Sequence, residues 1–273
     1  MNREQIEQHK QEIIDRFGPW TNHNIHLGHH LYTIDANLSG AEVKVRRFLQ
    51  AVSDLIEKPI SQLRVLDLAC LEGLYGIEFA LQGAQVVGIE GRESNLAKAR
   101  FTREVLGLEN IEFVQDDVRN LSVEKYGTFD VVLCLGIFYH LDAPDVFEFA
   151  DRIYQTCTRL AIFDTHVSLK AERSYTYRSQ QYWGRDYVED DTAWGSIGND
   201  RSVWLTRPSL YRLLADVGFS SVYECHFPTI PKFEQMRQDK VADRSTFIGL
   251  KNQAVRLKTT SLLAGEDREL RSL

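Results

Sequence analysis

The feature that most constrains this chain is a regular alternation of short apolar runs with amphipathic segments, which begins at residue 63. Aliphatic residues dominate the runs, as in LRVLDLAC and AQVVGIEG, and the segments between them space their apolar residues as helices do. Strands buried on both faces of a parallel sheet have near-continuous apolar sequences, and helices connect them. The alternation therefore predicts a doubly wound α/β sheet.

The expected elements follow one another in chain order. The predicted strands are 63–70, 84–91, 111–118, 129–136 and 159–167, and the predicted helices between them are 74–82, 93–107 and 144–156. A helix over 206–219, with Thr206 as its N-cap, and two late strands in FSSVYECHF and STFIGLKN complete the pattern. We expect the segment between the late strands, PTIPKFEQMRQDKVAD, to be a loop.

Three regions lie outside this alternation. Residues 1–60 predict helices over 3–17 and 40–57, joined by a loop rich in His and aromatic residues, and we expect them to form a lid. Residues 61–251 form the predicted core, interrupted at about 169–205 by a polar segment rich in Tyr and Trp, which is not typical of sheet strands and which we expect to fold over the edge of the sheet as a second lid. Residues 252–273 predict a mobile polar tail.

Composition narrows the classes of partner and compartment. The 273 residues carry a net charge of -7, which disfavours a partner held mainly by phosphate contacts. No apolar run approaches 18 residues and the charged N-terminus lacks a signal-peptide core, so we expect a cytoplasmic protein without a membrane partner. The 4 cysteines are far apart and predict buried free thiols.

The sequence DLACLEG, residues 67–73, follows the first predicted strand and opens a helix, where a ligand-binding turn of such a sheet must lie. Ala69 and Leu71 stand where such turns usually have glycine. We expect Ala69 to keep a negative φ, Leu71 to point away from the ligand, and Gly73 to allow the closest approach. A purely structural turn is the alternative.

Polar and glycine residues at the ends of the next strands favour a cofactor. Glu90 ends the second strand, where a carboxylate can accept both hydroxyls of a ribose, and Asp117 follows the third, where it can accept from an adenine amino group. Gly136 and Ile137 end the fourth strand and should line the same cleft. Each of these is also compatible with an ordinary surface or loop position.

DLACLEG, GIEGRESNLAKAR, FVQDDV and FDVVLCLGIFYHL resemble the successive motifs of class I S-adenosylmethionine-dependent methyltransferases. The resemblance implies a seven-stranded, Rossmann-like sheet with an antiparallel last strand and S-adenosyl-L-methionine as cofactor. It implies that Asp67 and Gly73 hold the methionine end, Glu90 the ribose, and Asp117 with Val118 the adenine. The full predicted cofactor-binding set is Asp67, Ala69, Gly73, Glu90, Gly91, Asp117, Val118 and Gly136.

A dinucleotide dehydrogenase is the main competing interpretation of the turn. It would require GxGxxG beside a pyrophosphate, whereas this chain has Glu72 next to the expected phosphate position. An acid there would repel pyrophosphate and tolerate a cationic sulfonium, which favours the methyltransferase interpretation.

Candidate catalytic residues should lie at the ends of the fourth and fifth strands. They are Tyr139, His140, Asp164 and His166, with a base needed if the acceptor is a hydroxyl. The alternative for His140 is a packing role at a helix entrance, and for His166 a contact with substrate.

The aromatic and histidine-rich lids supply the candidate acceptor residues. We expect Trp20, His26, Tyr32, Tyr182 and Trp183 to wall the acceptor pocket, with lid packing or a homodimer contact as the alternative. His23, His26, His29 and His30 cluster without a nearby carboxylate, so no metal site is predicted.

The leading hypothesis is methyl transfer to a small molecule, at oxygen, in a mostly apolar pocket. Because GIFYHLDAP resembles the matching stretch of the wobble-uridine tRNA modification family, an RNA acceptor is the alternative among enzymes, although the acidic balance counts against nucleic acid. A catalytically silent binding protein is the third hypothesis, which Glu90 and Asp117 disfavour.

Overall fold

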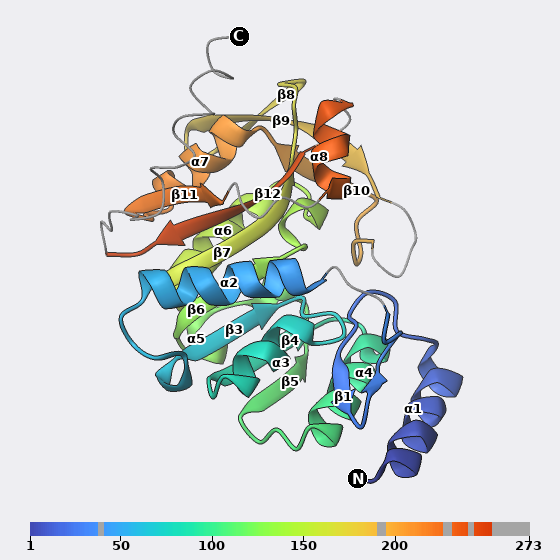
Figure 1. Cartoon of the computed structure of the whole chain (residues 1–273). Helices are drawn as coiled ribbons and strands as arrows, with labels where there is room; N and C mark the ends of the chain where they lie inside the picture. Colours follow the sequence, from blue (N-terminus) through green and yellow to red (C-terminus); the bar gives the residue numbers. More distant parts are fainter. Residues whose placement is uncertain (38–40, 190–194, 226–230, 240–242, 253–273) are drawn as a thin grey trace.

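A twisted seven-stranded sheet forms the centre of the computed structural model, which describes residues 1–37, 41–189, 195–225, 231–239 and 243–252 (Figure 1). Its strands lie in the order β11-β12-β7-β6-β3-β4-β5. The bounds are β3 Arg64–Leu68, β4 Gln85–Glu90, β5 Ile111–Gln115, β6 Phe129–Leu135, β7 Cys157–Val167, β11 Ser221–Cys225 and β12 Asp243–Leu250. β12 is antiparallel to both of its neighbours, and β3 to β7 pair in parallel. The predicted doubly wound sheet with an antiparallel last strand is confirmed.

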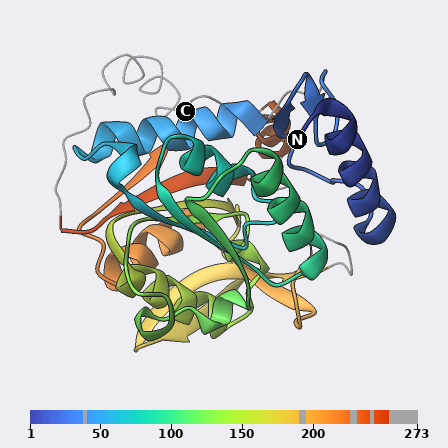
Figure 2. The same cartoon turned by 90° about the horizontal axis from the view of Figure 1, so that it is seen from below.

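Helices cover both faces of this sheet, as Figure 2 shows. One face packs against α2 (Ala41–Leu55), α3 (Leu74–Leu81) and α4 (Glu93–Val105), and the other against α6 (Asp145–Thr156) and α7 (Arg207–Asp216). Neighbouring residues in a strand point to opposite faces, so Val131 joins the first core and Val132 the second. The short helices η1 (Ile60–Gln62), η2 (Val118–Asn120), α5 (Val123–Tyr126) and η3 (Phe138–His140) complete the connections.

The N-terminal region packs beside α4. Its helix α1 (Arg3–Phe17) starts with a capping box between Asn2 and Gln5, in agreement with the predicted helix. The stretch that follows, expected to be a loop, contains a small hairpin of β1 (His26–Gly28) and β2 (Leu31–Tyr32). Trp20 and Leu27 bury against Phe101 of α4, which attaches this region to the core.

The insertion forms regular sheet, and our expectation that it lacks strands was wrong. β8 (Arg173–Tyr177), β9 (Gln180–Val188) and β10 (Arg201–Leu205) make a three-stranded antiparallel sheet. Tyr175, Tyr182 and Val203 turn inward to a core shared with α6 and α7, while Gln181 and Trp183, on either side of Tyr182, are exposed on the outer face. Tyr175 and Tyr182 therefore belong to the buried face of a half-exposed sheet.

The segment between the two late strands also differs from prediction, because it contains the helix α8 (Pro231–Gln238). Glu234 pairs with Arg237 one turn on. The predicted tail from 252 onward lies almost wholly outside the described residues. Within the described part of the chain, every helix is too short or too polar to cross a bilayer.

Candidate functional site

A cavity of about 650 Å³ lies beyond the carboxyl ends of β3, β4, β5 and β6. Strand-end residues form its floor, and residues 22–24, 195–197, the helix α8 and Lys44 of α2 form its walls. Its volume falls in the range of small-molecule sites, and its position is the one that open α/β sheets use for ligands. We therefore take this cavity as the candidate active site.

The glycine-poor turn after β3 keeps a left-handed backbone at the two unusual positions. Ala69 and Leu71 both have φ of +50°, so the expected negative φ of Ala69 was wrong. The Leu71 N–H donates to Glu90 Oε2 at 3.0 Å, and the Cys70 N–H donates to the Ile89 carbonyl at 2.9 Å. These two hydrogen bonds to β4 stabilise the strained backbone of the turn. Leu71 lines the cavity, so the expectation that it turns away from the ligand is not met either.

Gly73 serves packing rather than the cavity. Its φ is +87°, and a Cβ added there would lie 2.9 Å from the Phe113 ring and 3.0 Å from Ala99. Gly73 does not line the cavity, so the structure gives no support to the prediction that a ligand approaches closely at this glycine. The glycine is required because α3 begins in contact with β5 and α4.

Asp67 lies buried at the end of β3 and lines the cavity. Its Oδ2 accepts the Gly76 N–H at 2.8 Å, which fixes the start of α3 against the strand. Burial raises the pKa of Asp67 to about 7; the Gly76 hydrogen bond opposes this and the charge of Glu90 adds to it. A bound cation would lower that pKa and restore the carboxylate.

Glu90 ends β4 and is 4% exposed. Its Oε1 accepts the Arg92 N–H at 2.9 Å and the Asn95 amide at 3.3 Å, while Oε2 accepts from Leu71. These three donors fix the carboxylate at the cavity wall, and one of its about four lone pairs, on Oε2, stays free to accept a hydroxyl group. This position agrees with the predicted ribose contact, which stays a prediction.

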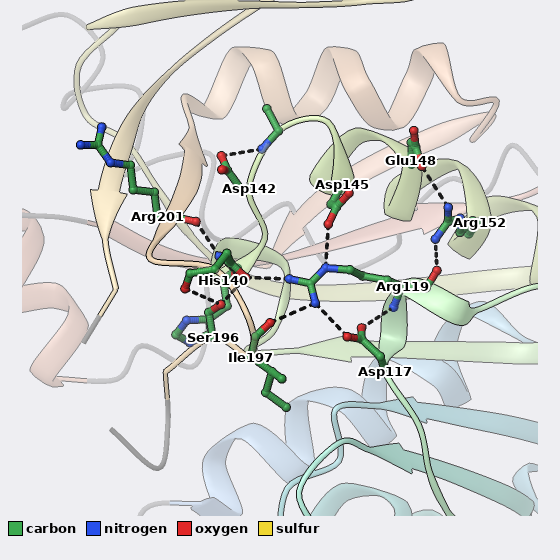
Figure 3. Close-up of polar contacts among 12 residues, drawn as sticks. Asp117, Arg119, His140, Asp142, Asp145, Glu148, Arg152, Ser196, Ile197 and Arg201 are labelled. Atoms are coloured by element: carbon green, nitrogen blue, oxygen red, sulfur yellow. Dashed lines mark hydrogen bonds and ion pairs between the residues drawn. The ribbon is translucent and has the colours of Figure 1, made fainter. Parts of the chain in front are cut away.

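The segment 195–199 of the insertion closes over the strand ends of β4 and β5 (Figure 3). Arg119 joins it to the core: the guanidinium pairs with Asp117 at 2.8 Å and donates to the Ile197 carbonyl at 3.0 Å. The Ile197 side chain lies so close to Gly91 that an added Cβ there would be 2.6 Å from it. Asp117, Val118 and Gly91 all line the cavity, and the contact of Asp117 and Val118 with adenine stays a prediction.

Glu72 holds the N-terminal region in place and does not line the cavity. It is fully buried and accepts the backbone N–H groups of Thr21, Asn22 and His23 at 2.8, 3.2 and 3.0 Å. Lys98 compensates its charge at 3.4 Å. The argument that Glu72 repels a pyrophosphate is thus wrong, because its carboxylate faces the 21–23 loop.

His23 attaches the 21–23 loop to the beginning of α3. Its Nδ1 accepts the Leu74 N–H at 3.2 Å, and its ring contacts Tyr75. Burial lowers the pKa of His23 to about 4, against the opposing charge of Glu72, so the ring stays neutral and keeps its acceptor nitrogen.

On the other side of the cavity lie three of the four predicted catalytic residues, Tyr139, His140 and His166. His166 stacks on Trp204 with ring centroids 4.6 Å apart and planes at 9°. Its buried Nδ1 has no hydrogen-bond partner, and burial together with the charge of Arg244 lowers its pKa to about 3. His166 is thus a neutral imidazole with an unused ring nitrogen. His140 instead bonds Glu189 at 2.8 Å through Nδ1.

Asp164, the fourth predicted catalytic residue, is not a cavity-lining base. Its Oδ1 accepts from Lys44 Nζ at 2.8 Å and Arg244 Nε at 2.6 Å, and its Oδ2 accepts from the Thr246 hydroxyl at 3.0 Å. Burial alone would raise the pKa of Asp164, but the charges of Arg244 and Lys44 hold it well below the usual range. Its role in the structure is to hold two cations in place. Arg244 also donates to the Tyr139 hydroxyl at 3.0 Å.

The five residues predicted to wall the acceptor pocket do not reach the cavity. Trp20 is buried against Phe101 of α4, and Tyr182 is buried in the core shared with α6 and α7, where its hydroxyl donates to Asp216. His26 and Tyr32 pack on each other in the N-terminal hairpin, and Trp183 is 45% exposed on β9. Among the described residues no group of His, Cys, Asp and Glu is arranged to hold a metal.

The cavity wall is instead formed in part by residues that the sequence did not single out, among them Lys44, Phe233, Met236 and Arg244. They come from α2, α8 and β12, which are distant in sequence. Nothing in the local sequence marks Lys44 or Arg244, because each belongs to an ordinary amphipathic helix or strand. Phe233 and Met236 fall in the segment predicted to be a loop, where helical spacing in KFEQMRQ was the available signal.

Comparison with known proteins identifies the core of the chain. Residues 65–159 match the family described as "Methyltransferase domain". The ubiquinone biosynthesis O-methyltransferase of Acinetobacter baumannii is 36% identical over 81 residues, which are 30% of this chain and 34% of that protein. The enzyme of the same name from Azotobacter vinelandii is 38% identical over 81 residues, with the same coverage of 30% and 34%. The chain thus spans about a third of the length of these curated relatives.

Solved structures resemble a larger part of the chain. The N-terminal domain of EvdMO1, crystallised in the presence of SAH and D-fucose, has a TM-score of 0.72 at 24% identity and covers 92% of this chain and 98% of that one. Magnesium protoporphyrin IX methyltransferase from Synechocystis with bound SAM has a TM-score of 0.53 at 17% identity, covering 77% and 78%. The chain therefore has the fold of class I S-adenosylmethionine-dependent methyltransferases. The comparisons do not support the resemblance to wobble-uridine tRNA enzymes.

Proposed function

We propose that this protein transfers a methyl group from S-adenosyl-L-methionine to an oxygen atom of a small molecule. The observation that carries the proposal is the row of Gly136, Asp67, Glu90 and Asp117 at the carboxyl ends of four neighbouring strands, β6, β3, β4 and β5, all lining one cavity. The similarity to O-methyltransferases of small molecules supports oxygen as the accepting atom.

The donor set of the cavity fits this cofactor. Asp67, Glu90, Asp116 and Asp117 make the strand ends of β3, β4 and β5 acidic. Such a wall suits hydroxyl groups, an amino group and a sulfonium. Glu90 would hold the ribose, Val118 and Ile197 would pack on the adenine, and Asp67 would face the cationic methionine end.

When bound, the cofactor supplies a methyl group on a positively charged sulfur. The residues of this chain would align the acceptor oxygen with that methyl and exclude water, which lowers the barrier through proximity. In the balanced reaction the acceptor oxygen forms a bond to the methyl carbon, the carbon–sulfur bond breaks with its electrons left on sulfur, and a hydroxyl proton leaves the acceptor.

His166 is the residue placed to take that proton. Its ring is neutral and lines the cavity beside Tyr139, with ring centroids 4.6 Å apart. Because burial keeps its pKa near 3, His166 would act as a hydrogen-bond acceptor that positions the hydroxyl and receives the proton only as the charge moves away from sulfur.

A screen of candidate hydroxy and carboxylic acids with radiolabelled S-adenosylmethionine tests the proposal. We expect label transfer to at least one acceptor by the wild-type protein, and loss of that transfer in Glu90→Ala. Failure of the protein to bind S-adenosylmethionine or S-adenosylhomocysteine in calorimetry would contradict it. Label transfer to nitrogen or carbon would keep the enzyme and overturn the accepting atom.

A further inference from the structure

The acceptor side of the cavity contains more positive than negative charge. Lys44 Nζ and Arg244 Nε contact the same oxygen of Asp164, at 2.8 and 2.6 Å. A third cation, Arg47, donates to the Thr246 hydroxyl, which in turn donates to the other oxygen of Asp164. Among the described residues, Asp164 is the one carboxylate that pairs with Lys44 and Arg244. One negative charge is therefore shared by two cations in contact and a third nearby.

These cations are largely removed from water, which makes the imbalance costly. The side chains of Lys44 and Arg244 are 12% and 16% exposed. Burial and the neighbouring charge of Arg244 lower the pKa of Lys44 to about 8, despite the contact with Asp164. Burial and a second cation thus both oppose the charge of Lys44 at this place.

Both cations reach the cavity and keep donors free for a ligand. Lys44 and Arg244 line it, and their described hydrogen bonds to other side chains leave two of the three Lys44 donors and the Arg244 Nη2 unused. A Cβ added at Gly136 would lie 3.1 Å from that Nη2, so the guanidinium lies directly over the end of β6. The Phe233 ring covers the pair, with its centroid 5.1 Å from Lys44 Nζ and 5.2 Å from Arg244 Cζ.

The proposed function increases this need for an anion. The end of β6 is where the sulfonium would lie, so a bound cofactor would add a further positive charge beside Lys44 and Arg244. Like charges this close repel unless a negative group lies between them. Phe233, Met236 and Tyr139 give the same side of the cavity apolar walls.

We infer that the methyl acceptor carries a carboxylate, which binds between Lys44 and Arg244 with its apolar body against Phe233 and Met236. This inference rests on the proposed function and defines the class of its substrate. The carboxylate neutralises the surplus cation pair and orients the acceptor next to the transferred methyl.

The test measures ligand binding to the full-length protein saturated with S-adenosylhomocysteine. Benzoate is the probe, and benzamide is its neutral match of the same shape. We expect calorimetry to detect benzoate and not benzamide, and Lys44→Met to weaken benzoate at least tenfold, with Lys44→Arg restoring most of the affinity. Lys58→Met is the control, because Lys58 pairs with Asp130 at 3.4 Å on the far end of the sheet and should bind benzoate like wild type.

A second arm distinguishes the acceptor from the carboxylate of the cofactor itself. S-adenosylhomocysteine has that carboxylate and 5′-methylthioadenosine lacks it. We expect Lys44→Met to change the affinity for both by less than threefold. A loss confined to S-adenosylhomocysteine would assign Lys44 to the cofactor and overturn the inference.

Equal binding of benzoate and benzamide, or wild-type benzoate affinity in Lys44→Met, would also overturn it. In both cases S-adenosylhomocysteine still binds and the proposed function stands. If S-adenosylhomocysteine fails to bind the wild-type protein, the proposed function falls and the inference falls with it.

Discussion

The two halves of the cavity are built in different ways. The half beyond β3, β4 and β5 is acidic and consists of residues that directly follow buried strands, such as Asp67, Glu90 and Asp117. The half beyond β6, β7 and β12 is cationic and is assembled from Lys44 on a helix, Arg244 on the antiparallel strand and residues of α8. The first half depends on local chain order, and the second on tertiary packing. A shared cofactor would bind in the first and an individual acceptor in the second.

The largest effect should come from His166 in the acceptor half. We expect His166→Ala to lower the methylation rate by about 10²–10⁴-fold, because it removes the neutral imidazole that receives the acceptor proton. S-adenosylhomocysteine affinity should change less than threefold. Initial rates with the acceptor found by screening provide the measurement, and His140→Ala, whose ring is held by Glu189, should show a smaller loss. An unchanged rate in His166→Ala would exclude it as the base.

Arg244 tests whether the acceptor half is held together by buried charge. Arg244→Met removes the hydrogen bonds to Asp164 and Tyr139 but leaves Asp164 paired with Lys44, and we expect a loss of about 1–3 kcal/mol in the free energy of unfolding. Chemical denaturation measures it. Arg237→Met is the matched control, since Arg237 is exposed and pairs within α8, and should cost less than about 0.5 kcal/mol. Equal losses in the two variants would show that the buried cluster does not determine stability.

Glu90 tests the cofactor half in the same way. Glu90→Ala removes the proposed ribose acceptor and leaves the N–H groups of Leu71 and Arg92 unpaired, so we expect S-adenosylhomocysteine affinity to fall by about 100-fold. Glu93→Ala is the control, because Glu93 pairs with Arg100 at the surface of α4. Calorimetric titration decides between them, and wild-type affinity in Glu90→Ala would remove the ribose assignment.

His23 links the N-terminal region to the beginning of α3, and its titration predicts that the stability of the protein depends on pH. Its folded pKa of about 4 is below the unfolded value near 6.5, so the unfolded chain takes up the proton first as pH falls. The contribution of the neutral ring is complete above pH 6.5 and is lost as pH falls towards 4, by about 1–3 kcal/mol. Urea unfolding at several pH values should show this loss in the wild type and not in His23→Gln. Parallel curves for the two proteins would contradict it.

The smallest effect should come from Trp183, which was predicted to bind the acceptor but lies 45% exposed on β9. Trp183→Ala should change turnover less than about twofold, because a surface substitution far from the cavity disturbs no contact with ligand. A loss of turnover of tenfold or more would indicate that the outer face of the insertion contacts the acceptor after all.

The sequence predicted the sheet and several residues that line the acidic half of the cavity, because both depend on short-range patterns. Apolar runs set the strands, and the residue after each run must lie at the same edge of the sheet, as Glu90 and Asp117 do. The conformation of Ala69 and Leu71 was missed, because it depends on a hydrogen bond from Leu71 to Glu90 in the next strand.

Such short-range patterns could not predict the cationic half of the cavity, beyond β6, β7 and β12. Periodicity places Lys44 and Arg244 on their own elements but says nothing of Asp164, where the fold brings them together. The aromatic insertion misled us for a related reason. Tyr175 and Tyr182 pack into the hydrophobic core instead of lining a pocket. A buried and a pocket-lining tyrosine look alike in the sequence, and only the tertiary structure distinguishes them.

A crystal structure of the complex with S-adenosylhomocysteine tests the division of the cavity most directly. We predict the ribose on Glu90, the adenine between Val118 and Ile197, and the sulfur at the end of β6, facing Tyr139 and Arg244. An S-adenosylhomocysteine molecule bound with its ribose among Lys44, His166 and Arg244, or outside the cavity, would contradict the account.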